Sequence, residues 1–101
     1  MSDETITLIN LLKVEPSKQD ALMALLKQNT DTVIRTLAGW KTTRLIAAKD
    51  RASVVIYSEW ESAAAVEAMR SDPRMTAYLP KILELASLES IVGSAVLSEG
   101  R

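Results

Sequence analysis

The chain has 101 residues, a length that suits one domain able to bury roughly two thirds of its extended surface. Its 12 basic and 13 acidic residues are interspersed and leave a net charge of −1, which argues against nucleic-acid binding and a polybasic membrane contact. The sequence has no cysteine and no histidine. This excludes a disulfide framework, thiolate metal ligands and imidazole as ligand or general base.

The start of the chain and its few glycines and prolines predict neither a secretory signal nor a linker. The start Met1-Ser2-Asp3-Glu4 is acidic, which is wrong for a secretory signal, and no apolar run has the length of a membrane span. Three glycines and three prolines leave no linker or repeat. We therefore expect one domain over residues 1–101, cytoplasmic, with no membrane or nucleic-acid partner.

The first part of the chain alternates between strand and helix patterns. Leu8, Asn10 and Leu12 share one face of an apolar strand. Ser17, with Asp20 three residues on, predicts a helix N-cap. The expected elements are a strand over 5–14, a helix from Ser17 to about Leu37 stopped by Ala38-Gly39, a strand over 40–49, a tight turn at Asp50-Arg51 and a strand over 52–60.

The second part of the chain is expected to contain a helical region divided into segments, followed by one more strand. Ser62 predicts the cap of a helix that runs to about Arg70. Asp72 predicts a second cap, with Pro73 at the first helical position, where its missing N–H costs nothing. Pro80 interrupts this segment, which predicts a short turn and then a helix over 80–87. The last strand is expected over 90–98.

The order β-α-β-β-α-β is that of the α+β, ferredoxin-like fold. It predicts one four-stranded antiparallel sheet with the helices on one face. A half-solvated sheet should alternate cleanly between apolar and polar residues, but Ile9 and Leu11 are as apolar as Leu8 and Leu12. The last strand is also apolar in both parities. The simplest cover for the second face is a second copy, which gives a homodimeric α/β barrel.

Polar residues on apolar faces are candidates for a site. Asn10 lies on the helix side of the first strand, and Asn29 interrupts the apolar stripe of the first helix. Trp60 and Ser58 share a face with Ile56, and Tyr78 lies on the stripe of the last helix. Together they predict an apolar cavity with a few polar groups, the usual form of a small-molecule site. The alternatives are structural: satisfied buried amides, Trp60 as a core anchor and Tyr78 as amphipathic cover.

Two segments carry a resemblance to a known family. They are Tyr57-Ser58-Glu59-Trp60-Glu61-Ser62-Ala63-Ala64-Ala65 and Ser71-Asp72-Pro73-Arg74-Met75-Thr76-Ala77-Tyr78. A strand that ends on a tryptophan, followed at once by a capped and broken helix, resembles the antibiotic biosynthesis monooxygenase family of small dimeric α/β barrels. The resemblance covers nearly the whole chain in element order, and it independently implies the homodimer.

Within that family, Asn10 matches a pocket asparagine of haem-degrading members, whose haem-ligating histidine corresponds to Tyr78 and whose haem-perturbing tryptophan corresponds to Met69. The absence of histidine disfavours a haem-oxygenase function. Anthrone-oxidising members keep the tryptophan matched by Trp60, with an asparagine where this chain has Ile56. The Trp60-Glu61-Ser62 segment and the start of the last helix look closest to quinol-oxidising members, which have histidines at Met69 and Arg74.

The resemblance implies a cofactor-independent monooxygenase that oxidises an electron-rich phenolic, quinol or anthrone-like aromatic with O2, without a metal. Asn10 would donate to the developing oxyanion, with Tyr78 or Asn29 as second donor and Trp60 as a stacking wall. Asn29, Ile56, Ser58 and Met69 would contact the substrate. The base would be the Tyr78 phenolate, a water, or the acidic substrate itself. Alternatives are a non-catalytic dimeric ligand-binding or stress-response protein and a barrel-type cyclase or isomerase.

Overall fold

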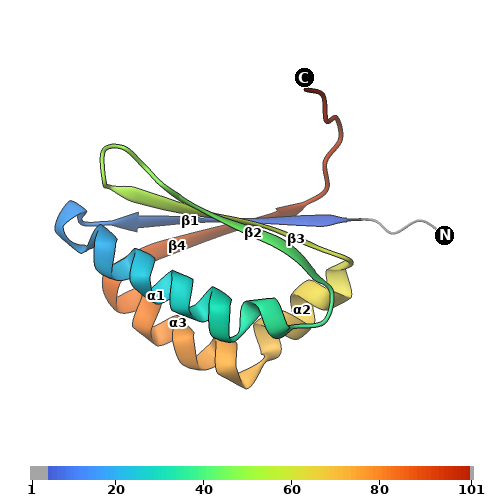
Figure 1. The fold of residues 1–101 in the computed structure, drawn as a ribbon, viewed down its shortest axis with the longest axis horizontal. Coiled ribbons are helices and arrows are strands. Elements are labelled where there is room, and N and C mark those ends of the chain that lie inside the picture. Colours follow the sequence, from blue (N-terminus) through green and yellow to red (C-terminus); the bar gives the residue numbers. More distant parts are fainter. Residues whose placement is uncertain (1–4, 101) are drawn as a thin grey trace.

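The computed structural model describes residues 5–100, which form a four-stranded antiparallel sheet with the α-helices on one face (Figure 1). The strands lie in the order β2-β3-β1-β4. The elements are β1 (Ile6–Val14), η1 (Pro16–Lys18), α1 (Gln19–Thr32), η2 (Ile34–Thr36), β2 (Trp40–Ala47), β3 (Ser53–Trp60), α2 (Ala63–Ser71), α3 (Pro73–Leu85) and β4 (Ala86–Gly93). The predicted ferredoxin-like fold is confirmed, with its second helix divided into α2 and α3. The acidic start Met1–Glu4 and the last residue lie outside the described residues.

The register of the sheet decides which side chains meet the helices. β1 pairs with β3 and β4 so that Asn10 lies opposite Ile56 and Ser90. Because successive side chains of a strand point to opposite faces, Asn10 shares the helix-covered face with Leu8 and Leu12. Two groups of buried side chains fill this layer: Leu12, Val14, Leu22, Leu26, Val54 and Ile82 in one, and Leu8, Ile34, Trp60, Val66 and Met69 in the other.

The first helix is shorter than its sequence pattern predicts. No side chain caps its start, so the predicted Ser17 cap is wrong; the chain enters through η1, where Lys18 N–H donates to the Glu15 carbonyl at 2.8 Å. α1 ends at Thr32 rather than Leu37, because Val33 leaves the helix at φ −124°. Three of the next four residues, counted from Val33, are β-branched and favour a helix less: Val33, Ile34 and Thr36. Within residues 5–100, no helix combines the length and apolar character needed to cross a membrane.

Gly39 does not end α1 as predicted, because that helix already ends at Thr32, but it lets the chain turn from η2 into β2. Its φ of +85° lies in the left-handed region, which glycine adopts at little cost. A Cβ at this position would lie 2.5 Å from the Ala65 Cβ of α2. The close approach brings the start of β2 against the start of α2, where Glu61 N–H donates to the Gly39 carbonyl at 2.8 Å.

Both predicted caps in the second part of the chain are confirmed. Ser62 accepts from Ala65 N–H at 3.1 Å, and Asp72 accepts from Arg74 N–H at 2.8 Å. The predicted break at Pro80 is wrong, because α3 continues through it to Leu85. Pro80 is exposed, so the carbonyl that loses its partner can face solvent, while Ile82 keeps the helix packed on the sheet.

The last strand begins four residues earlier than predicted and ends at Gly93. β4 pairs with β1 from Ala86 opposite Val14 to Gly93 opposite Thr7, so the length of β1 limits it. Val96 and Leu97, which suggested a strand over 90–98, lie beyond the sheet and are exposed. The apolar residues at 91–97 were therefore a poor guide to strand limits, which depend on the partner strand.

Candidate active site

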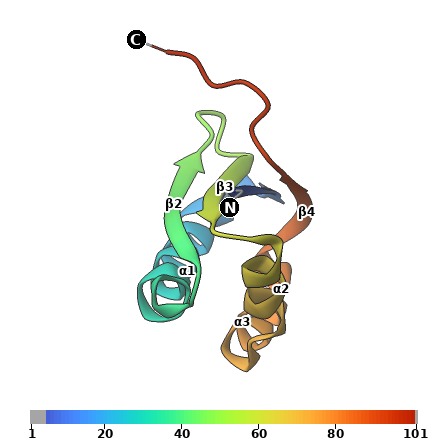
Figure 2. The same cartoon turned by 90° about the vertical axis from the view of Figure 1, so that its right-hand side faces the viewer.

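A cavity of about 340 Å³ lies between the helix-covered face of the sheet and the helices. Figure 2 shows α1 on one side beneath the sheet and α2 with α3 on the other. Most of the wall is apolar, with Leu8 and Leu12 from β1, Leu26 from α1 and Ile82 from α3. Six of the seven predicted site residues line this cavity: Asn10, Asn29, Ile56, Ser58, Trp60 and Met69.

Trp60 forms a fixed part of the wall at the end of β3. Its side chain is 1% exposed, and the indole Nε1–H donates to Ser58 Oγ at 3.0 Å. Ser58 Oγ in turn donates to the Leu8 carbonyl at 3.4 Å. The indole N–H and the Ser58 hydroxyl are therefore occupied by each other and by the backbone. Trp60 can offer a ligand its aromatic face, while Ser58 holds the ring in place.

Asn10 places an amide in the middle of the sheet. Ser90 Oγ, on the neighbouring strand β4, donates to Asn10 Oδ1. This contact uses the carbonyl oxygen of the side chain, so the Asn10 amide Nδ2 is the group able to donate to a ligand. Asn10 is half-buried and stands between the apolar side chains of Leu8 and Leu12. The arrangement orients one hydrogen-bond donor within a largely apolar space.

Asn29 carries the clearest sign of an unmet interaction. It lies on the buried side of α1 with 3% of its surface exposed, and within the described part of the chain its Oδ1 has no hydrogen-bond partner. A buried acceptor without a donor costs about 1–3 kcal/mol. Its neighbours in the cavity wall, Leu26 and Ile34, cannot supply one. A ligand with a hydroxyl or N–H group would satisfy this oxygen.

Ile56 and Met69 supply apolar surface to the same cavity. Ile56 lies opposite Asn10 on β3, and Met69 comes from the last turns of α2. Neither side chain can transfer a proton. Both fit the predicted role of contacting the flat apolar part of a substrate.

Tyr78 is not brought together with the other six predicted residues. It belongs to α3, but it is not part of the cavity wall among residues 5–100. Its hydroxyl lies 3.4 Å from Thr32 Oγ1 on α1, and the Lys81 ammonium lies 5.5 Å from the centre of its ring. This geometry corresponds to the alternative interpretation, in which Tyr78 covers the packing of α3 against α1.

Several cavity residues were absent from the predicted set, notably Thr43, Arg70, Met75, Thr76 and Ser90. Ser90 could have been found by placing the last strand in register with Asn10. Thr43 Oγ1 accepts from Trp40 Nε1–H at 2.8 Å, a contact between two residues of β2. The sequence did not identify Arg70 as a cavity residue, because a charged residue at the end of a surface helix is ordinarily solvated.

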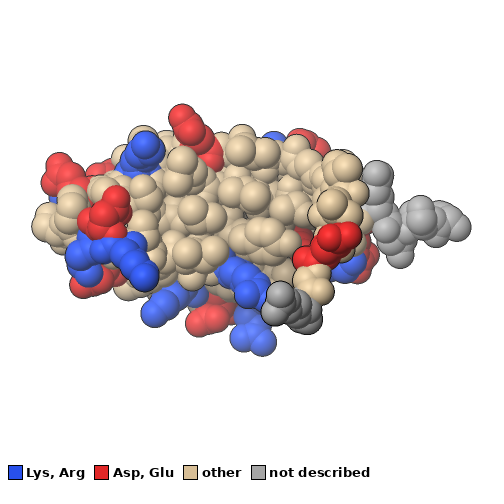
Figure 3. Space-filling view, turned by 90° about the horizontal axis from the view of Figure 1, so that it is seen from above, with Lys and Arg blue, Asp and Glu red and all other residues tan. Residues whose placement is uncertain are grey.

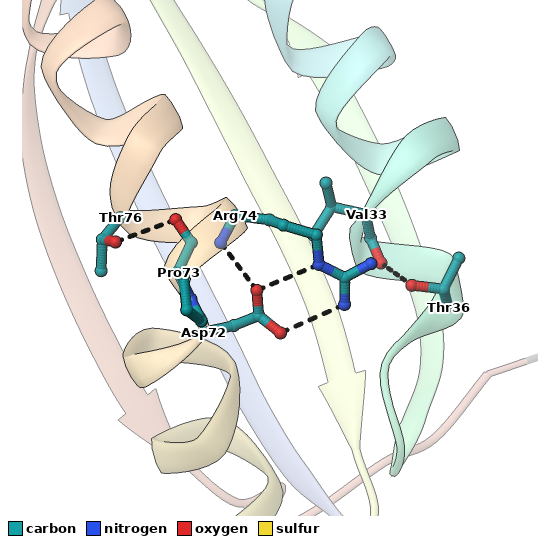
Figure 4. A network of polar contacts seen from close by, with 6 residues as sticks. All are labelled: Val33, Thr36, Asp72, Pro73, Arg74 and Thr76. Atoms are coloured by element: carbon teal, nitrogen blue, oxygen red, sulfur yellow. Dashed lines mark hydrogen bonds and ion pairs between the residues drawn. The ribbon is translucent and has the colours of Figure 1, made fainter.

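Arg74 precedes the cavity residues Met75 and Thr76 in the sequence, but its side chain is bound to Asp72 and does not line the cavity (Figure 4). Its guanidinium binds Asp72 through two contacts of 3.1 Å, from Nε to Oδ1 and from Nη2 to Oδ2. The guanidinium, helped by the Arg74 backbone N–H, holds the pKa of Asp72 below its ordinary value. The pair closes the junction of α2 and α3, so Arg74 acts as a structural charge.

Comparison with known proteins agrees with this architecture. The family model described as "Antibiotic biosynthesis monooxygenase" matches residues 5–81. The tetracenomycin-F1 monooxygenase of Streptomyces glaucescens is 36% identical over 74 residues, which are 73% of this chain. The match spans 66% of the length of that relative.

Solved structures share the fold at lower identity. The structure of Rv0793 from Mycobacterium tuberculosis superimposes with a TM-score of 0.80 and 24% identity, over 96% of this chain and 99% of that one. SnoaB, a cofactor-independent oxygenase from Streptomyces nogalater, gives a TM-score of 0.79 and 17% identity, over 94% of this chain and 96% of its own. At these identities the likeness shows the fold alone.

Proposed function

Since the chain belongs to the antibiotic biosynthesis monooxygenase family, we propose that it is a cofactor-independent monooxygenase acting with O2 on an electron-rich phenolic, quinol or anthrone-like aromatic. The observation that carries the proposal is the mainly apolar cavity of about 340 Å³, whose wall includes the Trp60 indole, a few neutral polar groups and one arginine. Such a cavity suits a flat aromatic that must be oriented and kept from water.

The chemistry would come mainly from the substrate. An anthrone loses a proton to give an enolate, which passes one electron to O2. The two radicals combine to form a C–O bond, and the resulting peroxide loses water. The CH2 group and one O2 molecule thereby become a carbonyl group and water. The protein has to supply a dry cavity, orientation and a donor for the developing oxyanion.

The cavity residues suit these roles. The Asn10 amide Nδ2 would donate to the oxyanion, and its orientation is held by Ser90. Trp60, fixed by Ser58, would stack on the aromatic ring. Asn29 Oδ1 would accept from a substrate hydroxyl. Because Tyr78 does not line the cavity, an acidic substrate ionising to water is a better supported route than a Tyr78 phenolate.

The competing function is non-catalytic binding of a small apolar ligand. It is favoured by one observation: among the described residues that line the cavity, none is a carboxylate, lysine or tyrosine that could act as a base. Binding alone needs no base. Oxidation needs a substrate whose acidity makes one unnecessary. The two functions therefore differ in whether the bound aromatic compound is oxidised.

We also propose that a second copy covers the outer face of the sheet. Figure 3, which views this face, shows uncharged side chains over its middle and most charged side chains towards its edges. The apolar side chains on the outer face of the sheet include those of Ile9, Leu11 and Ile91. An apolar centre inside a charged rim is the composition of a protein interface.

The test is oxygen uptake by protein treated with a chelator, using 1,8-dihydroxyanthrone and a series of quinols without added flavin or metal. Uptake should scale with protein, and the quinone product should appear in equal amount. The heat-denatured protein serves as the control for autoxidation. Binding of these compounds without uptake above that control would contradict the oxygenase and favour the binding function.

A further inference from the structure

We infer that the substrate of this cavity carries an acidic group, held by Arg70, and a hydroxyl group, held by Asn29 from the opposite wall. The inference rests on the proposed function and names the class of its substrate: a hydroxylated aromatic acid or an aromatic with one strongly acidic hydroxyl. Two observations carry it. One is a cation in the cavity wall that has no strong partner, and the other is the buried acceptor of Asn29.

Arg70 is the charged residue among the described residues that line the cavity. It lies in the last turn of α2, whose Val66 and Met69 are buried beneath the sheet. Its side chain is 42% exposed, so it stands at an opening of the cavity. A guanidinium at this place can bind a carboxylate or phenolate through two parallel N–H donors.

The existing contact of Arg70 would not compete with a ligand. Its Nη1 lies 3.8 Å from Glu67 Oε2, beyond hydrogen-bond distance, and the Glu67 side chain is 73% exposed. Exposed ion pairs of this kind contribute little to stability. Arg74, four residues later, differs in both respects, because Asp72 binds it at 3.1 Å and it does not line the cavity (Figure 4). Of these two arginines, Arg70 is therefore the one available to an anion in the cavity.

Asn29 selects the other part of the ligand. Its oxygen is an acceptor, so it attracts a hydroxyl or N–H donor and repels an ionised oxygen. A site built around a polar group discriminates strongly against analogues that leave the group unpaired. Asn29 belongs to α1 and Arg70 to α2, which lie on the two sides of the space beneath the sheet (Figure 2). The ligand should therefore place its neutral hydroxyl towards α1 and its acidic group towards α2.

The position of Arg70 also explains how a substrate could ionise although none of the described residues of the cavity wall can act as a base. A guanidinium favours the ionised form of an acidic hydroxyl next to it. With Arg70 at the opening, the released proton can pass directly to solvent water. For a substrate whose acidic group is a hydroxyl, Arg70 would thus promote ionisation without accepting a proton, and the protein would need neither histidine nor a carboxylate in the cavity.

The test measures binding by calorimetry at neutral pH with three related probes. These are 6-hydroxy-2-naphthoate with both groups, 2-naphthoate with the acid alone, and 2-naphthol with the hydroxyl alone. Arg70→Gln should weaken both acids about tenfold and leave 2-naphthol unchanged. Asn29→Leu should weaken the two hydroxylated probes about tenfold relative to 2-naphthoate. Arg70→Lys should restore part of the lost affinity.

Arg74→Gln is the matched control, since it removes the same charge from the same region. It should lower the melting temperature and leave all three affinities unchanged. Equal losses for Arg70→Gln and Arg74→Gln, equal losses for acids and 2-naphthol, or no binding of any probe to the unaltered protein would overturn the inference. Binding needs no turnover, so the expected affinities without oxygen uptake would reject the oxygenase alone. Oxygen uptake that ignores Arg70 and Asn29 would reject this inference alone.

Discussion

The two faces of the sheet contrast sharply although the same strands build both. On β1, Leu8 and Leu12 are buried under the helices, while their neighbours Ile9 and Leu11 point to the other face. Ile91 on β4, opposite Ile9, is 66% exposed. The helices of one chain thus account for half of the apolar pattern. The other half indicates a surface whose cover comes from outside the chain.

Polar groups also behave differently on the two faces. On the helix-covered face, Asn29 Oδ1 is unpartnered and Asn10 Nδ2 faces a cavity. On the outer face, the Tyr57 hydroxyl donates to Glu59 two residues along the same strand. The Tyr57 hydroxyl is thus paired within its own strand, whereas the Asn29 oxygen has no partner among the described residues. Unsatisfied polarity in an apolar layer is the better guide to function.

The largest effect should separate two adjacent leucines. Leu12→Ala removes a fully buried side chain and should lower the free energy of unfolding by about 2–5 kcal/mol, independently of protein concentration. Leu11→Ala, the matched change on the outer face, should cost less at low protein concentration and more at high concentration, where a second copy covers it. Denaturant titrations at two concentrations measure both. Equal, concentration-independent losses would remove the contrast between the faces.

The next effect concerns turnover on the helix-covered face. Asn10→Leu should reduce oxygen uptake with a phenolic substrate by about a hundredfold, because it removes one oriented oxyanion donor. Its melting temperature should stay the same or rise, since an apolar side chain of similar size fills an apolar space. Both quantities are measured on one sample.

Two variants sharpen that result. Tyr57→Phe removes a polar group from the outer face and should leave uptake unchanged. Ser90→Ala removes the hydroxyl bonded to Asn10 and should reduce uptake less than Asn10→Leu does. If Asn10→Leu instead lowers stability while the folded fraction keeps its activity, Asn10 is a structural residue and leaves the site to Trp60 and Asn29.

A smaller effect should appear in self-association. Ile91→Ser replaces an exposed apolar side chain at the proposed interface and should raise the dimer dissociation constant about tenfold or more. Sedimentation across a concentration series measures the change. Val96→Ser, in the segment beyond β4, provides an exposed control that should change the constant less. A stable monomer of the unaltered protein at micromolar concentration would reject the second-copy proposal.

The smallest effect is a pH dependence on the outer face. The hydrogen bond to Glu59 and partial burial raise the pKa of Tyr57 above its ordinary 10.0. A raised pKa means that the neutral phenol is favoured on folding, so its contribution to stability is present below pH 10 and lost as the pH rises through the folded value. Ultraviolet titration should show a phase of phenolate formation with a midpoint above pH 10, and Tyr57→Phe should remove that phase.

The sequence alone determined the element order, the two caps of the second helical region and six of the residues that line the cavity. The caps are local features of the sequence. Ser62 and Asp72 each accept a backbone N–H from the first turn of their own helix, and Pro73 has no N–H to leave unpaired there. Asn10 and Asn29 were identifiable because a polar residue interrupts an apolar period. The absence of apolar–polar alternation on β1 likewise indicated a second apolar face that the chain's own helices leave uncovered.

Only the tertiary structure decided where elements end and what each polar group meets. α3 continues through Pro80 because its packing against the sheet outweighs one lost hydrogen bond, and β4 is limited by the length of β1 rather than by its own apolar residues. Ser90 reaches Asn10, Arg70 reaches the cavity and Tyr78 turns to Thr32 through contacts between residues far apart in the chain. Periodicity specifies the face of an element but not its partner across the fold, which depends on register and on the packing of helices against the sheet.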